Sequence, residues 1–243
     1  MKNKSRSLFL VAFACIFILI AGFRQRASES SLEGAWHMRN GTTEAVLIYQ
    51  DGYFVHTMFN KADKKFIFSS GGTYKDKTGQ LICRIEFDTK EAGNVGTEQV
   101  VDFTLAGDKM NVSGKDGMKR MLTRIDGGSG ELAGTWRITG RMMDGKINEM
   151  PHRDRKTLKI LSGTRFQWMA INPATKEFFG TGGGTYTFAN GKYTEHVEFF
   201  SRDSSRVGAI LSFEGTVKED VWNHSGKSSK GDPLNEIWTK EKN

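Results

Sequence analysis

The stretch "TGGGTYTFANGKYTEHVEF" (residues 181–199) repeats an earlier stretch of the same chain, "SSGGTYKDKTGQLICRIEF" (residues 69–87), without a gap and at an offset of 112 residues. The same offset relates the chain from Val46 and Leu158 onward, as far as Gly114 and Gly226. A gapless similarity of this length indicates that the chain contains two copies of one structural unit.

Each copy also has matching ends. The openings are "LEGAWHM" (32–38) and "LAGTWRI" (132–138), and the closings are "MLTRI" (121–125) and "IWTKE" (237–241). The second copy carries about twelve additional residues between Trp136 and Leu158. We therefore predict four parts, which are an N-terminal segment (1–27), a first domain (31–126), a "GGSG" linker (127–130) and a second domain (131–243).

Within each copy, short runs of alternating apolar and polar residues are separated by turn sequences such as "KDKTGQ". This pattern is typical of antiparallel strands joined by hairpins. Beyond the N-terminal segment, no stretch of ten residues shows helical periodicity. Each domain is therefore predicted to be all-β, with six to eight antiparallel strands.

The N-terminal segment has the pattern of a secretory signal. Lys2, Lys4 and Arg6 precede an uncharged apolar run at residues 8–23. We expect export from the cytoplasm, with the segment either cleaved or retained as the only membrane anchor. The segment holds five basic and no acidic residues, so the remainder of the chain has a net charge of only about +2. That balance argues against a nucleic-acid partner, and the single remaining cysteine, Cys83, cannot form an intrachain disulfide.

The ends of the two copies resemble those of lipocalin-like (calycin) β-barrels. In that family a Gly-x-Trp motif opens the first strand, and a basic residue of the last strand covers the indole in a cation–π contact. The matching residues here are Trp36 with Arg124, and Trp136 with Lys240. The amino-acid sequence of the second copy also resembles that of a family of exported bacterial proteins with lipocalin-like domains of unknown function. The resemblance implies two tandem barrels and an exported location, and it implies no activity.

Comparison of the copies predicts which side chains point into each barrel. Cys83, Ile85 and Phe87 match Glu195, Val197 and Phe199, and this mostly apolar set is expected to face inward. The alternate positions, which include His196 and Glu198, are expected to face outward. We interpret His196 and Glu198 as a solvated cross-strand pair, with a functional dyad as the alternative.

The predicted interior of the second barrel contains polar residues that the first barrel lacks. By the same phase, Phe166, Trp168, Glu195, Trp222 and His224 face inward. Two interpretations stay open. Glu195 and His224 could pair inside a filled core, or the set could line a cavity whose aromatic walls and few polar groups bind a small molecule.

These observations favour an exported, non-enzymatic protein that binds a small amphipathic molecule in its second barrel. The alternative is a cell-envelope structural or protein-interaction module with filled barrels. A third hypothesis is a hydrolase or isomerase that uses Glu195 and His224 as a base–acid pair. We predict no metal, since only His224, Glu195 and His152 could converge, and no cofactor, since nothing accompanies His224 as a haem ligand.

Overall fold

The computed structural model describes residues 31–114, 117–143, 145–228 and 230–241. The predicted signal segment (1–27) lies outside these residues. None of the helices in the described ranges has the length and apolar character that a bilayer crossing requires.

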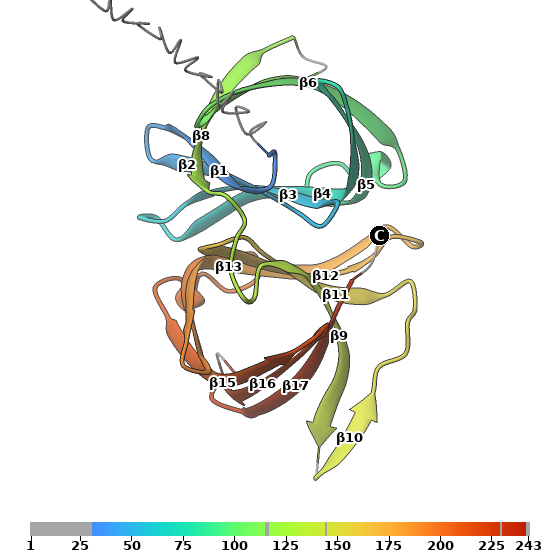
Figure 1. The fold of residues 1–243 in the computed structure, drawn as a ribbon, viewed down its shortest axis with the longest axis vertical. Helices are drawn as coiled ribbons and strands as arrows, with labels where there is room; N and C mark the ends of the chain where they lie inside the picture. The colour runs from blue at the N-terminus through green and yellow to red at the C-terminus, as the bar shows by residue number, and fades with distance from the viewer. Residues whose placement is uncertain (1–30, 115–116, 144, 229, 242–243) are drawn as a thin grey trace, which may run out of the picture.

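The first half of the chain forms a closed antiparallel barrel in which each strand pairs with the next one and β8 pairs back with β1 (Figure 1). Its strands are β1 (Gly34–Asn40), β2 (Thr43–Gln50), β3 (Tyr53–Asn60), β4 (Lys65–Lys77), β5 (Gln80–Asp88), β6 (Glu98–Ala106), β7 (Lys109–Ser113) and β8 (Lys119–Asp126), with the 3-10 helix η1 (Ala92–Asn94) between β5 and β6.

The second half repeats this arrangement, with β17 pairing with β9 to close the barrel. Its strands are β9 (Gly134–Met143), β11 (Lys156–Leu161), β12 (Arg165–Asn172), β13 (Glu177–Ala189), β14 (Lys192–Phe200), β15 (Ile210–Lys218), β16 (Val221–Lys227) and β17 (Pro233–Lys240), with η2 (Ser204–Arg206) between β14 and β15. The prediction of two all-β units with up to eight antiparallel strands each is confirmed.

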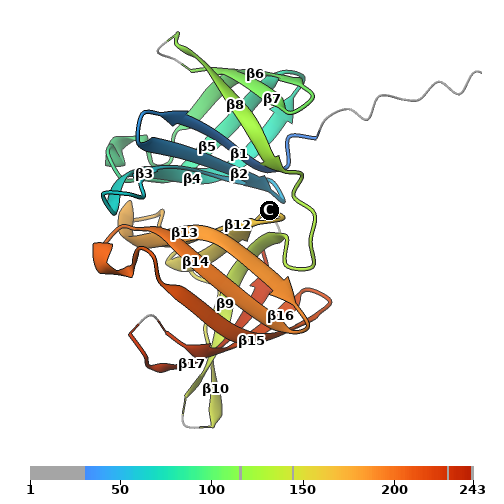
Figure 2. The same cartoon turned by 90° about the vertical axis from the view of Figure 1, so that its left-hand side faces the viewer.

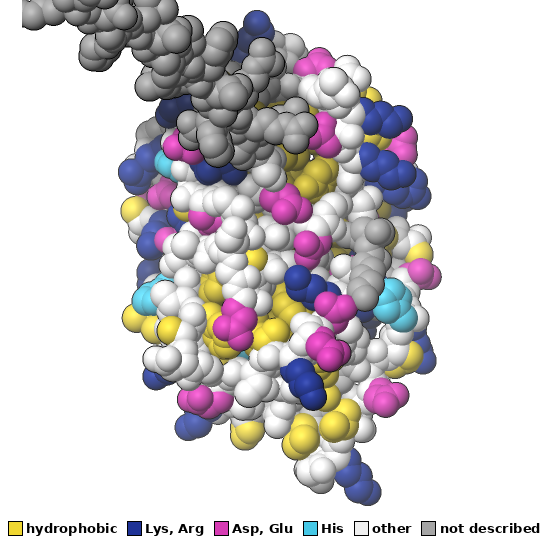
Figure 3. Space-filling view, viewed as in Figure 1, with side chains coloured by type: hydrophobic (Ala, Val, Ile, Leu, Met, Phe, Trp, Pro, Cys, Tyr) yellow, Lys and Arg dark blue, Asp and Glu magenta, His cyan; other side chains and the backbone are white. Residues whose placement is uncertain are grey.

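The extra residues of the second copy form a hairpin, in which β10 (Lys146–Glu149) pairs only with the end of β9 among the described residues. The hairpin projects from the lower barrel in Figures 1 and 2. Its side chains include the exposed Met142, Met143 and Ile147, and hydrophobic side chains are visible at this lower end of the molecule in Figure 3.

A tight hairpin turn and a close contact between neighbouring backbones explain why both copies have glycine at certain positions. Asn190 and Gly191 join β13 to β14 with φ values of 53° and 74°, as the type I′ turn of a two-residue hairpin requires. Gly184, in β13, has no room for a side chain, because a Cβ there would lie 2.0 Å from the carbonyl oxygen of His196. Gly72 stands in the same relation to Arg84 in the first copy.

That close approach accompanies a β-bulge in each barrel. The register shifts between Gly71 and Gly72, and again between Gly183 and Gly184, so that Glu86 and Glu198 have no direct partner on the neighbouring strand. A bulge reverses the inward–outward alternation of the residues that follow it. The predicted inward position of Phe87 and Phe199 is therefore wrong, and both rings lie on the outside of their barrels.

The outer faces of the two barrels pack against each other. Strands β2–β5 of the first barrel lie against β11–β14 of the second (Figure 2). The apolar residues buried there form one cluster, which comprises Ala35, Val46, Ile48, Tyr53, Val55, Phe59, Phe87, Leu158, Ile160, Met169, Ile171 and Phe199. The outward apolar positions of these strands are thus buried between the barrels instead of facing water.

The packing is nearly twofold symmetric. Phe66 lies 6.3 Å from Phe199 between ring centroids, and the equivalent residues Phe178 and Phe87 lie 6.0 Å apart. This ring contact of the first copy on the second thus has its counterpart in the other direction. Two similar barrels related in this way use the same surface patch, as the subunits of a symmetric dimer do.

Candidate functional site

A cavity of about 420 Å³ lies inside the first barrel. Its walls are mainly apolar and include Leu47, Tyr49, Phe54, Ile85 and Leu122. Alternation along the strands brings these side chains together, since each occupies an inward position of a different part of the barrel. The cavity is large enough and apolar enough to be of the kind that binds small molecules.

Trp36 belongs to the same core and is fully buried. Its indole Nε1 donates to the carbonyl oxygen of Leu32 at 2.9 Å, and the Arg124 guanidinium lies 4.0 Å from the centre of its ring. In the second barrel, Trp136 donates to Leu132 at 2.9 Å, and Lys240 Nζ lies 5.6 Å from its ring centre. The four residues that the sequence analysis assigned to the barrel ends therefore meet in two pairs.

The first cavity also has polar wall residues, among them His56 and Arg120. Nε2 of His56 is buried and has no hydrogen-bond partner among the described residues. Burial, with a smaller effect from the positive charge of Arg120, lowers the pKa of His56 to about 4. The imidazole is therefore neutral at pH 7 and presents an unsatisfied polar atom in a mainly apolar surrounding, which is costly unless a ligand or water bonds to it.

Two further groups of the cavity are not available to a ligand in the same way, because one is already hydrogen-bonded and the other is uncharged. The carboxylate of Asp88 accepts hydrogen bonds from the backbone N–H groups of Lys90 and Glu91 and from the side chain of Asn94. Burial raises the pKa of the Cys83 thiol to about 12, so the sulfur is uncharged and a poor nucleophile at neutral pH. His56 is thus the group in this cavity whose bonding the chain leaves incomplete.

The second barrel brings together the residues that the sequence analysis proposed as a ligand site. Phe166, Trp222 and His224 are almost fully buried, Glu195 is 5% exposed, and Trp168 packs at the margin of the same core. The ring centroids of Trp222 and His224 lie 5.1 Å apart. Trp168 is the most peripheral of the five, with its ring against Phe200 at 5.4 Å.

The pair of Glu195 with His224, one of the two interpretations left open by the sequence, is replaced by two other pairs. Glu195 Oε1 accepts a hydrogen bond from Lys159 Nζ at 2.9 Å, and both side chains are buried. His224 Nδ1 lies 3.6 Å from Glu236 Oε2. Burial lowers the pKa of His224 and thereby favours its neutral form, so the interior holds two carboxylates and one buried ammonium.

Lys159 and Glu236 were not predicted from the sequence. Lys159 lies in "TLKIL", where Leu158 and Ile160 match the apolar Val46 and Ile48 of the first copy. Those flanking residues face the other barrel, and this leaves Lys159 pointing inward. Extending the inward phase to β11 would have found it, but apolar neighbours on both sides suggested the opposite orientation.

Glu198 is not part of a solvated pair with His196. His196 is exposed, whereas Glu198 is buried and binds Lys61 of the first barrel at 2.9 Å and Arg165 of its own barrel. Its counterpart Glu86 accepts from Tyr53 at 2.7 Å and from Lys156 of the second barrel. The two bulged glutamates therefore join the barrels and do not form a catalytic or metal-binding dyad.

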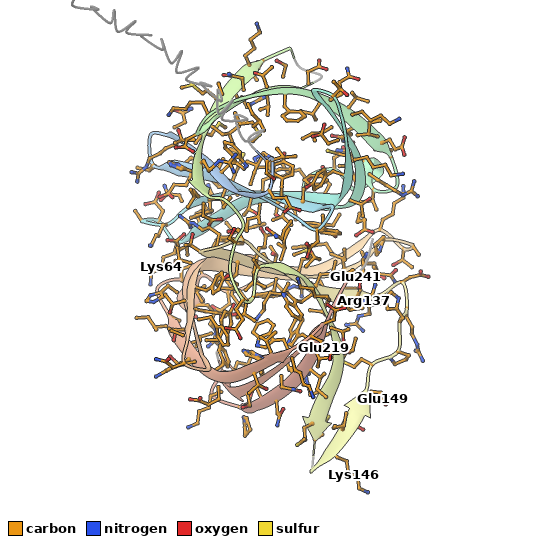
Figure 4. All side chains as sticks on the ribbon, viewed as in Figure 1. Lys64, Arg137, Lys146, Glu149, Glu219 and Glu241 are labelled. Carbon is orange, nitrogen blue, oxygen red and sulfur yellow. The ribbon has the colours of Figure 1, made fainter. Side chains whose placement is uncertain are left out.

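A wider hollow of about 700 Å³ also lies where the barrels meet. Its charged walls are largely neutralised by one another, since Arg137 binds Glu241 with two hydrogen bonds of 2.8 and 3.0 Å, and Lys156 binds Glu86. Figure 4 shows Arg137 and Glu241 side by side at this place. In the part of the chain that the structure describes, no group of three or more His, Cys, Asp or Glu could hold a metal ion.

Comparison with known proteins adds no assignment: no protein-family model matches the chain, and no curated protein matches it significantly.

Proposed function

We propose that the protein is an exported, non-enzymatic binding protein for a small amphipathic molecule, and that the ligand occupies the first barrel. The observation that carries the proposal is the cavity of about 420 Å³, whose apolar walls surround the unpartnered Nε2 of His56. An apolar body would fill the space, and one hydroxyl, carbonyl or amide group would complete the bonding of the imidazole.

The ends of the barrels support this function. Each first strand opens with Gly-x-Trp, and a basic side chain of the last strand covers each indole. Lipocalin-like proteins, which the sequence resembles, share this arrangement, and it leaves the opposite end of a barrel available for ligand entry. Export is proposed on the apolar, basic-flanked segment at residues 1–27.

The first barrel is favoured over the second because of what fills each interior. In the second barrel Lys159 extends into the space between the aromatic rings, and Glu195 binds it. The equivalent residues of the first barrel are the uncharged Leu47 and Cys83, which line the cavity. The enzyme hypothesis gains no support, since Glu195 is held by Lys159 and is not poised as a base beside His224.

The proposal is tested with the fluorescent probe 1-anilinonaphthalene-8-sulfonate and two variants of strand β5. Cys83→Phe places a ring in the cavity, while Ile82→Phe places the same ring on the outer face of the same strand. We expect saturable binding at one site in the wild type, at least a tenfold loss of affinity in Cys83→Phe, and little change in Ile82→Phe. Absence of saturable binding, or equal loss in both variants, would refute the first-barrel site.

The natural ligand can be sought in the same preparation. Small molecules extracted from the purified wild type and from Cys83→Phe are compared by mass spectrometry. A compound that accompanies the wild type in near-equimolar amount and is missing from Cys83→Phe is expected, and its chemical class would define the ligand.

A further inference from the structure

The most unusual group in the second barrel is the ammonium of Lys159. Its side chain is only 5% exposed, and Nζ lies 5.1 to 6.0 Å from the centres of four aromatic rings. The rings belong to Phe166, Tyr193, Trp222 and Trp238. Each distance falls within the range in which the face of an aromatic ring attracts a cation.

One carboxylate completes the surroundings of this ammonium. Glu195 Oε1 lies 2.9 Å from Lys159 Nζ, and its own side chain is 7% exposed. The negative charge of Glu195 also contributes, after burial, to raising the pKa of Tyr193, which keeps that phenol neutral. The ammonium is therefore hydrogen-bonded to one carboxylate and lies over four rings, with little exposure to solvent.

The first barrel does not contain this arrangement. Its residues at the positions of Lys159, Glu195 and Trp222 are Leu47, Cys83 and Met110. A buried lysine is not needed to close such a barrel, because the first barrel closes with leucine in that place. Removing an ammonium from water costs free energy unless charge and ring contacts replace its hydration. The four rings and the Glu195 carboxylate, which we call the cage, provide these contacts for a buried lysine that the fold itself does not require.

We propose that the interior of the second barrel is a recognition site for a primary alkylammonium group, and that the chain occupies this site with its own Lys159. Four rings and one carboxylate form a complete receptor for an –NH₃⁺ group on an unbranched chain. The lysine supplies that ligand in the same molecule, from strand β11, and Phe166 of the cage lies on the neighbouring strand β12. The inference is independent of ligand binding in the first barrel.

The site can be emptied and refilled. Lys159→Ala removes three methylene groups and the ammonium, which together correspond to n-propylammonium. We expect n-propylammonium chloride to raise the melting temperature of Lys159→Ala saturably, by at least about 3 °C, and to change its tryptophan fluorescence. Neutral 1-propanol at the same concentration should give less than a third of this shift.

Matched controls distinguish binding of the amine in the cage from its nonspecific effects on stability. The wild type, in which the cage is full, and Lys156→Ala, which removes the neighbouring lysine bound to Glu86, should show no saturable response. Adding Glu195→Gln to Lys159→Ala should weaken n-propylammonium at least tenfold. An equal response to propanol, or the same response in Lys156→Ala, would overturn the proposal.

The wild-type chain supplies a second measurement if Lys159→Ala fails to fold with or without the amine. Protons on Cε of a lysine enclosed by four rings are shifted upfield by ring currents, and the amine is shielded from reagents. In the native protein, nuclear magnetic resonance should show that shift for Lys159, and reductive methylation should modify Lys159 at least tenfold more slowly than Lys61, whose side chain is half exposed. Ordinary shifts, or methylation at the rate of other lysines, would show that the cage does not hold this ammonium.

Discussion

Lys61 of the first barrel binds Glu198 of the second, with 2.9 Å between Nζ and Oε1. Glu198 is the bulged residue of β14, and the bulge turns its carboxylate toward the other barrel, where Arg165 also binds it. A backbone irregularity in one barrel thus supplies a charge that joins the two. The hydrogen bond of 2.6 Å from Thr57 Oγ1 to Gln167 Oε1 makes a further polar connection within the same apolar interface.

Replacing Glu198 by Gln should lower the free energy of unfolding by about 2–3 kcal/mol. The change leaves Arg165 without its carboxylate in a poorly hydrated place, although Lys61 is half exposed and loses less. Urea unfolding followed by tryptophan fluorescence measures the effect. The matched control is His196→Gln on the same strand, which is expected to cost less than about 0.5 kcal/mol. Equal effects of the two variants would restore the interpretation of a solvated pair.

Replacing Trp136 by Ala should cost about 3–5 kcal/mol of unfolding free energy, the usual range for a fully buried tryptophan. The change removes the ring that lies beneath Lys240 and packs at 5.8 Å against Trp222. Thermal and urea unfolding both report it. A loss below about 1 kcal/mol would contradict the role of this residue at the barrel end.

Gly184→Ala should lower the free energy of unfolding by about 3 kcal/mol or more, since the added Cβ would lie 2.0 Å from the His196 carbonyl oxygen and the bulge would have to move. The control is Gly127→Ala in the linker, where a Cβ meets no atom within 4 Å. That variant should differ from the wild type by less than about 0.5 kcal/mol. If both substitutions were tolerated, the close approach at the bulge would be disproved.

The protein should lose stability as the pH falls from 6.5 to 4. The folded-state pKa of His56, about 4, lies below the unfolded value, so the unfolded chain takes up a proton first. The loss from this residue is roughly 3 kcal/mol at most. His224, whose pKa burial also lowers, acts in the same direction. Urea unfolding at several pH values should show a smaller loss for His56→Phe, and an unchanged slope in that variant would contradict the prediction.

A further loss of folding stability is expected as the pH falls from 4.5 to about 2. Burial alone would raise the pKa of Glu236, but the nearby His224, Lys159 and Arg141 outweigh it and lower the pKa to about 2. The stabilisation by this carboxylate is therefore present above pH 4.5 and disappears as the pH falls toward 2. Glu236→Gln should be less stable than the wild type at pH 6 and should show less of this acid-dependent loss. A wild-type acid transition that is unchanged in Glu236→Gln would argue against the pairing.

Much of the architecture follows from the sequence alone. The offset of 112 residues showed the duplication, period-two alternation showed antiparallel strands, and "KDKTGQ" at 75–80 marked the hairpin turn between β4 and β5. Alternation also oriented Cys83 and Ile85 into the first barrel, where the structure places them along the cavity. These features could be predicted because each depends on residues close together in the chain or on the comparison of two copies.

Only the tertiary structure decided what lies against each face and how completely each interior is filled. Alternation states that Leu158 and Ile160 share a face, but another barrel covers that face, and this contact turns Lys159 inward. The bulge at Glu198 reverses the phase within one strand, and it accompanies a close approach of Gly184 to the backbone of His196. Which barrel retains a cavity depends on the combined volume of side chains from eight strands. These are non-local properties, so no short stretch of this sequence contains them.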